Sequence, residues 1–234
     1  MGRFSGIAAA LAGFCALVPV ATADTVDVGA LAAVQRTVYG VPPEGSQTVK
    51  RLGDAILFQE ELETAEDSAA LVRFIDDSTL ALGAKSKVLI DAFVFDPAKA
   101  EGNALIRISV GTLRFVTGDM PKGRTTIKTP TATLVLRGTD VTVHVHPDGT
   151  TDTTVNDGIV DAHNEVTGDD ASIAAGQGTT LGAGGNSGFS GQTPPTGPGA
   201  DGEADSPPEH RRGGNPQSTG PGGTSSGSSS RSGS

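Results

Sequence analysis

Apolar and polar residues alternate along most of the middle of this chain, which is the pattern of β-strands with one buried face. The clearest example lies between Thr126 and His146, where two alternating segments flank the sequence Arg137-Gly138-Thr139-Asp140. Pro130 cannot donate a ladder hydrogen bond, and Gly138 admits backbone angles that are closed to other residues. We therefore expect strands that bend or change partner at Pro130 and Gly138.

Similar alternating segments recur between residues 70 and 115, separated by turn residues such as Asp, Ser, Gly and Pro. Gly111 falls where the apolar positions change parity, so we expect a β-bulge there that keeps one face buried. Short strands with regularly spaced turn signals predict an all-β domain.

Two further segments are less regular. Residues 28–38 fit the spacing of a helix as well as that of a strand, and both interpretations stay open. Glu60 to Glu66 is rich in acidic residues and is interpreted as a solvated loop.

Both ends of the 234-residue chain differ from its middle. Residues 1–23 contain one charge, an apolar run and a small-x-small ending, which predicts a signal peptide cleaved on export to the periplasm or beyond. The apolar run is shorter than the roughly 20 residues of a membrane-spanning helix, so we expect no membrane span in the mature chain. Residues 182–234 are mostly Gly, Ser, Pro and Thr and are expected to form a disordered tail. One domain of residues 24–181 is expected between them.

Charge and residue types narrow the function. The formal net charge is −10, and a nucleic acid is not an expected partner because phosphate binding needs a basic face. The only cysteine, Cys15, lies in the predicted signal peptide, which excludes thiol chemistry from the mature chain. No serine-hydrolase, zinc-protease or phosphate-loop motif occurs, so we expect no enzyme, no catalytic residues and no cofactor.

Three histidines are the best candidates for a metal site. His144 and His146 are two residues apart and share one strand face, and His163 could supply a third ligand for zinc or copper. A half-solvated strand gives the same pattern, and a closed site needs more ligands than this. The prediction is that these histidines bind no metal.

Several blocks of residues resemble the FecR-domain family of exported bacterial proteins. The most specific runs from Thr129 to Asp140 and contains T-P-x-A followed by R-G-T-D. The other blocks are Gly53 to Ile56, Ala70 to Leu82, Leu105 to Phe115 and Val155 to Val160. The resemblance covers roughly residues 45–181.

This resemblance implies an all-β domain, solenoid-like or sandwich-like, that senses extracytoplasmic signals or binds proteins. The best-known members pass iron-siderophore status from an outer-membrane receptor to a cytoplasmic sigma factor, and they carry an anti-sigma segment and a membrane helix where this chain has its predicted signal peptide. We therefore expect an unidentified protein partner. The alternatives are a structural or adhesive component of the envelope or matrix, with the tail as spacer, and a metal-binding sensor.

The residues of the specific block are expected to be structural. Arg137 and Asp140 flank Gly138 and are expected to pair across the corner, which would satisfy buried backbone groups without any ligand. Pro130 and Thr139 complete this structural motif.

Overall fold

A computed structural model describes residues 26–190, which form β-strands and no helix. Among these residues, no helix is therefore long and apolar enough to cross a membrane. The predicted signal peptide, residues 1–23, lies outside the described residues, as does the expected tail beyond Ser190.

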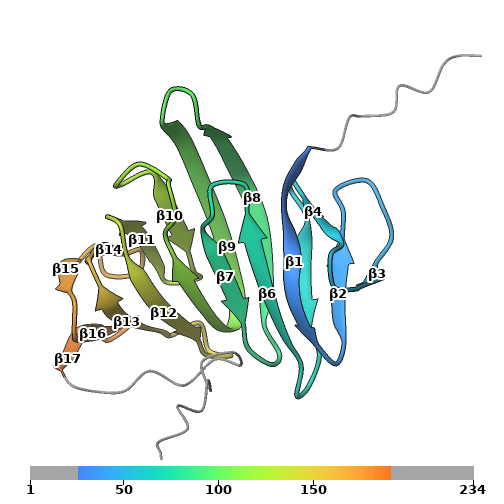
Figure 1. The fold of residues 1–234 in the computed structure, drawn as a ribbon. Helices are drawn as coiled ribbons and strands as arrows, with labels where there is room; N and C mark the ends of the chain where they lie inside the picture. The colour runs from blue at the N-terminus through green and yellow to red at the C-terminus, as the bar shows by residue number, and fades with distance from the viewer. Residues whose placement is uncertain (1–25, 191–234) are drawn as a thin grey trace, which may run out of the picture. The chain divides into compact units, whose positions relative to one another are not determined.

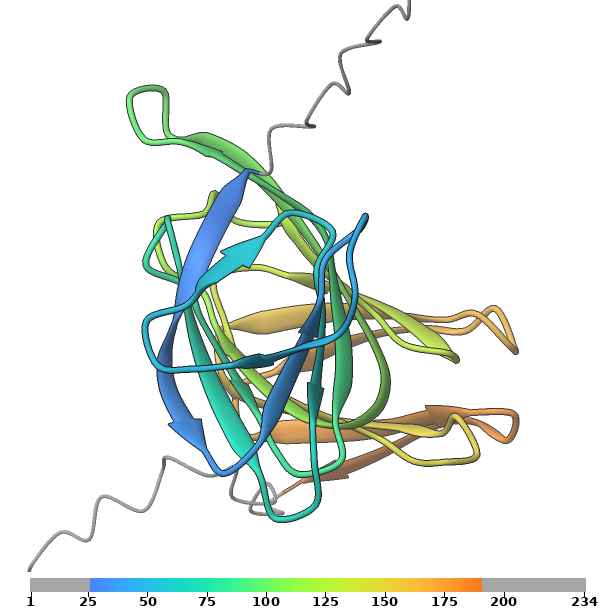
Figure 2. The same ribbon diagram turned by 90° about the vertical axis from the view of Figure 1, so that its right-hand side faces the viewer.

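The strands form one hydrogen-bonded array that folds over along its longest strand, β9 (Glu101–Val116) (Figure 1). Two layers result, and Figure 2 shows them facing each other. In spatial order, sheet A consists of β4 (Ala55–Leu57), β1 (Asp27–Gln35), β6 (Ala69–Phe74), β7 (Thr79–Leu82), the second half of β9, β12 (Asp140–Val145), β13 (Thr151–Asp157), β16 (Gln177–Gly182) and β17 (Gly185–Ser190).

Sheet B is built in the same way on the first half of β9. In spatial order it consists of β3 (Thr48–Lys50), β2 (Val38–Val41), β5 (Glu61–Thr64), β8 (Lys87–Asp96), β9, β10 (Thr125–Lys128), β11 (Ala132–Leu136), β14 (Ile159–Asn164) and β15 (Asp170–Ala174). Pairing is antiparallel except between β9 and β10. The all-β prediction is confirmed, the architecture is sandwich-like, and the strand interpretation of residues 28–38 is correct for β1.

Strand β9 changes sheets at Gly111. Before this residue β9 pairs with β8 and β10, and after it with β7 and β12. The register of β8 on β9 slips between Val88, opposite Ile108, and Lys87, opposite Val110. Gly111 follows with φ of 97°, a conformation that L side chains rarely adopt. A bulge is therefore present close to the predicted position, with Ser109 as its extra residue, and Leu113 continues the buried face on the other parity.

The core lies between the sheets and is aromatic at its centre. Phe74 of β6 stacks on Phe93 of β8 across the layers, with ring centroids 4.3 Å apart. Phe115 of β9 lies 6.2 Å from Phe74. All three rings are buried, and each contributes on the order of 1.5–3 kcal/mol by leaving water.

The acidic segment from Glu60 to Glu66 is not a loop, because residues 61–64 form β5 inside sheet B. Glu60 is fully buried, with Lys50 Nζ 2.6 Å from its Oε1. The Leu57 amide donates to Glu60 Oε2 at 2.9 Å, while Lys50 directs a hydrogen bond at the Ala55 carbonyl. A buried carboxylate needs such partners. The loop interpretation was wrong because composition does not show that Lys50 lies beside Glu60.

The ordered strands also continue past the expected end of the domain at Leu181. Strand β16 runs to Gly182, and β17 pairs with it from Gly185 to Ser190. The ordered strands therefore extend to Ser190, beyond the start of the expected tail at residue 182. A hairpin of small residues obtains its order from main-chain pairing, which the absence of apolar side chains does not reveal.

Substituting Gly111 with Ala is expected to lower the free energy of unfolding by about 2–4 kcal/mol, through an unfavourable φ and crowding. A Cβ there would lie 2.4 Å from Ser86 Oγ and 2.8 Å from the Lys85 carbonyl oxygen. Gly184→Ala is the matched control, because a Cβ at Gly184 meets nothing within 4 Å. Urea unfolding followed by circular dichroism measures both changes. Similar midpoints for the two variants would contradict the sheet-switching role of Gly111.

Candidate functional site

The structure places the specific block, residues 129–140, where the chain passes from sheet B to sheet A. Pro130 lies in the turn before β11, where Thr129 Oγ1 accepts a hydrogen bond from the Ala132 amide at 2.9 Å. Gly138 lies between β11 and β12 with φ of 68°. The Thr139 carbonyl accepts a hydrogen bond from the Thr117 amide, which fixes the start of β12 beside the end of β9.

A neighbouring turn packs closely on this corner. A Cβ at Gly158, which also has positive φ, would lie 2.2 Å from the Gly138 carbonyl oxygen. The corner therefore depends on glycine at two positions that are distant in sequence.

The expected pairing of Arg137 with Asp140 is wrong. Arg137 Nε donates to Asp161 Oδ2 of β14, on the outward face of sheet B. Asp140 lies in β12 and pairs with Arg114 of β9, on the outward face of sheet A. The two residues are close in sequence, but the Gly138 corner sends them into different sheets, so their side chains cannot meet.

Arg114 holds Asp140 in a two-pronged ion pair. Arg114 Nε lies 2.9 Å from Asp140 Oδ1, and Nη2 lies 2.7 Å from Oδ2. Asn156 Nδ2 donates to Oδ1 at 3.2 Å. Burial opposes ionisation of Asp140, but the hydrogen bonds from Arg114 and Asn156 outweigh it and lower the pKa of the carboxyl. The pair ties β9, β12 and β13 together.

A second polar cluster crosses the same face of sheet A. Thr112 Oγ1 and His144 Nδ1 lie 2.7 Å apart, and the two imidazoles of His144 and His146 meet edge to face with centroids 4.4 Å apart. His146 Nε2 donates to Asp152 Oδ2 at 2.8 Å, and Thr180 Oγ1 donates to Asp152 Oδ1 at 2.6 Å. The cluster thus spans β9, β12, β13 and β16 with five polar side chains.

His163 does not join this cluster. It lies in β14 of sheet B, where His163 Nδ1 is 2.8 Å from Asp170 Oδ1. Its hydrogen bond with Asp170 raises the pKa of His163. In contrast, burial and the neighbouring charge of His146 lower the pKa of His144. Within residues 26–190 no group of three or more His, Cys, Asp or Glu side chains has the arrangement of a metal site.

The Thr112 and His144 contact pairs a hydroxyl with a base, which is one element of a nucleophilic site. In such sites a carboxylate orients the base through its second nitrogen. Here Asp152 bonds His146 instead of His144, so the orienting element is directed at the other imidazole. The arrangement is that of a hydrogen-bonded polar surface that can contact another molecule.

Sequence reasoning placed His144 and His146 together on one strand face but missed Arg114, Asp152 and their partners. A period-two pattern assigns a residue to a face and says nothing of the strand beside it. Only the register, with His144 opposite both Thr112 and Asp152, brings these side chains together.

Comparison with known proteins gives one family match. A family model described as FecR protein matches residues 60–161. Two crystal structures, at 2.50 and 1.65 Å resolution, of a "putative anti-sigma factor" from Parabacteroides distasonis ATCC 8503 are similar, with TM-scores of 0.46 and 14% identity. Each match covers 57% of this chain and 60% of the other, so it spans less than two thirds of that protein's structure. No curated protein matches the chain.

Substituting Asp140 with Ala is expected to lower the free energy of unfolding by about 1–3 kcal/mol, because charge-assisted hydrogen bonds are lost. A double-mutant cycle with Arg114→Ala should give a coupling energy of about 1 kcal/mol. The matched cycle on Arg36 and Asp67, an exposed pair 3.4 Å apart, should give less than about 0.5 kcal/mol. Urea unfolding provides the energies, and equal coupling in the two cycles would contradict the proposed role of the pair.

An NMR pH titration is expected to show His144 titrating below the ordinary histidine pKa and His163 above it. His146→Gln should raise the midpoint of His144 only in part, because burial is the larger cause and remains. The folded state favours neutral His144, so this residue's contribution to stability is full above the unfolded pKa. It is lost as the pH falls through that value toward the folded pKa. A reversed order of the two midpoints would contradict these assignments.

Proposed function

We propose that this chain, whose residues 60–161 match the FecR family model, acts as a non-enzymatic, exported module that senses an extracytoplasmic signal by binding another protein. The match to the FecR family over residues 60–161 carries this proposal. Those residues include β9, the Gly138 corner and most strands of both sheets.

The roles of the motif residues support a binding module. Arg137 and Asp140 are engaged in ion pairs within the chain, and Gly138 serves the passage between sheets. These residues therefore build the scaffold. The outward face of sheet A, with Thr112, His144 and other polar side chains, is available for contacts with a partner.

Export is part of the proposal. Residues 1–23 have the pattern of a cleaved signal peptide, and the proposed compartment is the periplasm or the exterior. An exported protein receives signals from outside the cytoplasm. A partner in the envelope would carry the signal further.

Crosslinking in the native host tests this function. The full chain with a C-terminal affinity tag is crosslinked in cells, purified under denaturing conditions and analysed by mass spectrometry. We expect one envelope or regulatory protein to be enriched over an unrelated exported protein with the same tag, and an intact mass that begins at Asp24. Enrichment of polysaccharide or fibre material alone would favour the adhesive alternative, and retention of Met1 would contradict export.

A further inference from the structure

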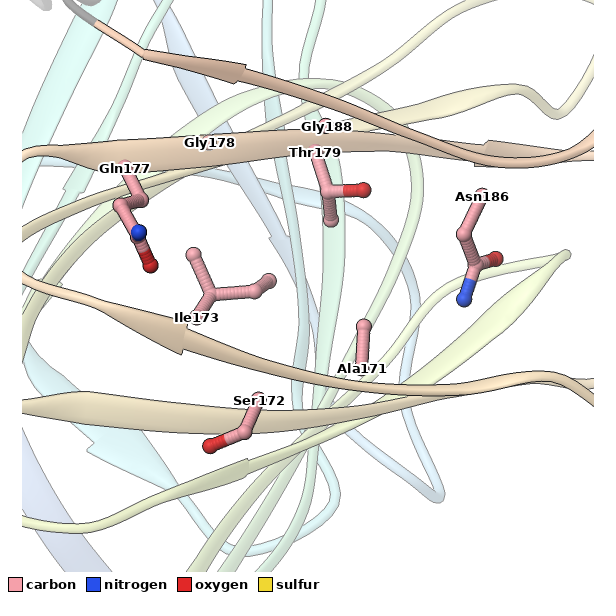
Figure 3. A pocket seen from close by; sticks show the side chains of 8 residues that line it. All are labelled: Ala171, Ser172, Ile173, Gln177, Gly178, Thr179, Asn186 and Gly188. Atoms are coloured by element: carbon pink, nitrogen blue, oxygen red, sulfur yellow. The ribbon is translucent and has the colours of Figure 1, made fainter.

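An open groove lies between the two sheets at the end of the domain formed by the last strands, as Figure 3 shows. It has a volume of about 440 Å³. Side chains from β15, β16 and β17 face it, namely Ala171, Ile173, Gln177, Thr179 and Asn186. Ile173 and Thr179 are buried and form its floor. The groove is therefore narrow, partly apolar and bounded by main chain.

The strands that border the groove have free edges. Within residues 26–190, β15 pairs only with β14, and β17 pairs only with β16. Unpaired edge N–H and C=O groups are a template for an added strand. Natural edges are often protected by charged residues or proline, and β17 contains neither.

The opposite end of the domain is closed by the chain itself. Gly53 and Asp54, in the link from β3 to β4, exchange main-chain hydrogen bonds with Leu31 of β1. The Gln59 amide donates to the Ile90 carbonyl of β8. These crossings connect the two sheets at this end, whereas at the other end the edges of β15 and β17 stay unpaired within the described residues.

A buried hydrogen-bond donor also points to a missing partner. Asn186 Nδ2 is buried and has no acceptor among the described residues, while Asn186 Oδ1 accepts from Asn164 Nδ2 at 2.9 Å. An unpaired buried donor is unfavourable, so a carbonyl oxygen that reaches it is favoured. The main chain of an added strand supplies such oxygens.

The negative charge at this end of the domain indicates which kind of segment can bind in the groove. Residues 151–190 contain no Lys or Arg but include Asp152, Asp157, Asp161, Glu165, Asp169 and Asp170. Asp169 Oδ2 lies 3.5 Å from the Cβ position of Gly185, at the start of β17. A second copy of this end would bring the same negative charge and is repelled, whereas a basic segment is complementary.

We propose that this groove binds an extended, basic segment of a partner protein, which adds to the free edge of β17 as a further strand. The proposal rests on the proposed function and names the part of the domain that engages the partner. Small or apolar side chains of the segment face Ile173 and Thr179, one of its carbonyls accepts from Asn186, and its Lys or Arg residues lie near Asp169.

Gly188→Leu is designed to fill the groove without strain. Gly188 lines the groove, has no positive φ, and a Cβ there meets only the Gly178 carbonyl oxygen, at 3.9 Å. Gly184→Leu adds the same side chain in the β16 to β17 turn, where there is open space. Circular dichroism and unfolding midpoints check that both variants fold like the parent.

The probe is a random ten-residue peptide library displayed on phage and selected on the full chain. We expect selected peptides that are rich in Lys or Arg and contain no central Pro, with affinity at least tenfold lower for Gly188→Leu and unchanged for Gly184→Leu. Hydrogen exchange of the parent should show new protection of β17 amides when a selected peptide is bound, which supports the site even if Gly188→Leu does not fold.

Three results would overturn the proposal: no selected peptide, selected peptides without basic residues, or protection that avoids β17. A concentration-dependent dimer that Gly188→Leu disrupts would assign the groove to a second copy. Protection of β17 in the full chain without peptide would assign it to the chain's own C-terminal residues. If crosslinking in cells still captures the same partner with Gly188→Leu, the groove proposal fails while the proposed function stands.

Discussion

The two sheets of this domain are joined through a strand that belongs to both, and the arrangement of every other strand depends on it. Strand β9 can serve two sheets because Gly111 takes a positive φ and a neighbouring register slip restores the buried face. The sheets then grow outward from β9 on both sides, with β7 and β12 in one layer and β8 and β10 in the other. The stacked rings of Phe74 and Phe93 join the two layers.

The specific block, residues 129–140, also serves the passage of the chain between the two sheets. After β11 extends sheet B, the chain has to return to sheet A, and Gly138 makes the turn. The charged residues on either side of Gly138 then anchor separate layers, Arg137 to Asp161 and Asp140 to Arg114. This short sequence signature thus reflects a topological requirement of the fold.

How much of the structure the sequence predicts depends on whether each interaction joins residues that are near or distant in sequence. Alternation is local, so the strand faces and the parity change at Gly111 could be predicted. Pairing is not local: Arg114 pairs with Asp140 on the neighbouring strand, although Arg137 is much nearer to Asp140 in sequence. From the sequence Glu60 looks solvated, because Lys50 lies beside it only in the folded chain. Strand β17 shows no apolar alternation, because main-chain pairing with β16 holds it in place. The sequence therefore predicts only part of the candidate surface: it places the histidines on one strand face but does not identify their hydrogen-bond partners.

The strand order determines which part of the domain opens locally. Each strand beyond β9 pairs mainly with its immediate neighbours, as in a linear array of repeats, so opening β17 breaks its ladder with β16 and the Asn164–Asn186 hydrogen bond. Local opening should then cost progressively less from the aromatic centre toward β17. Fraying at this end leaves the centre of the array intact. This end can therefore open by local fluctuation, without the barrier of global unfolding.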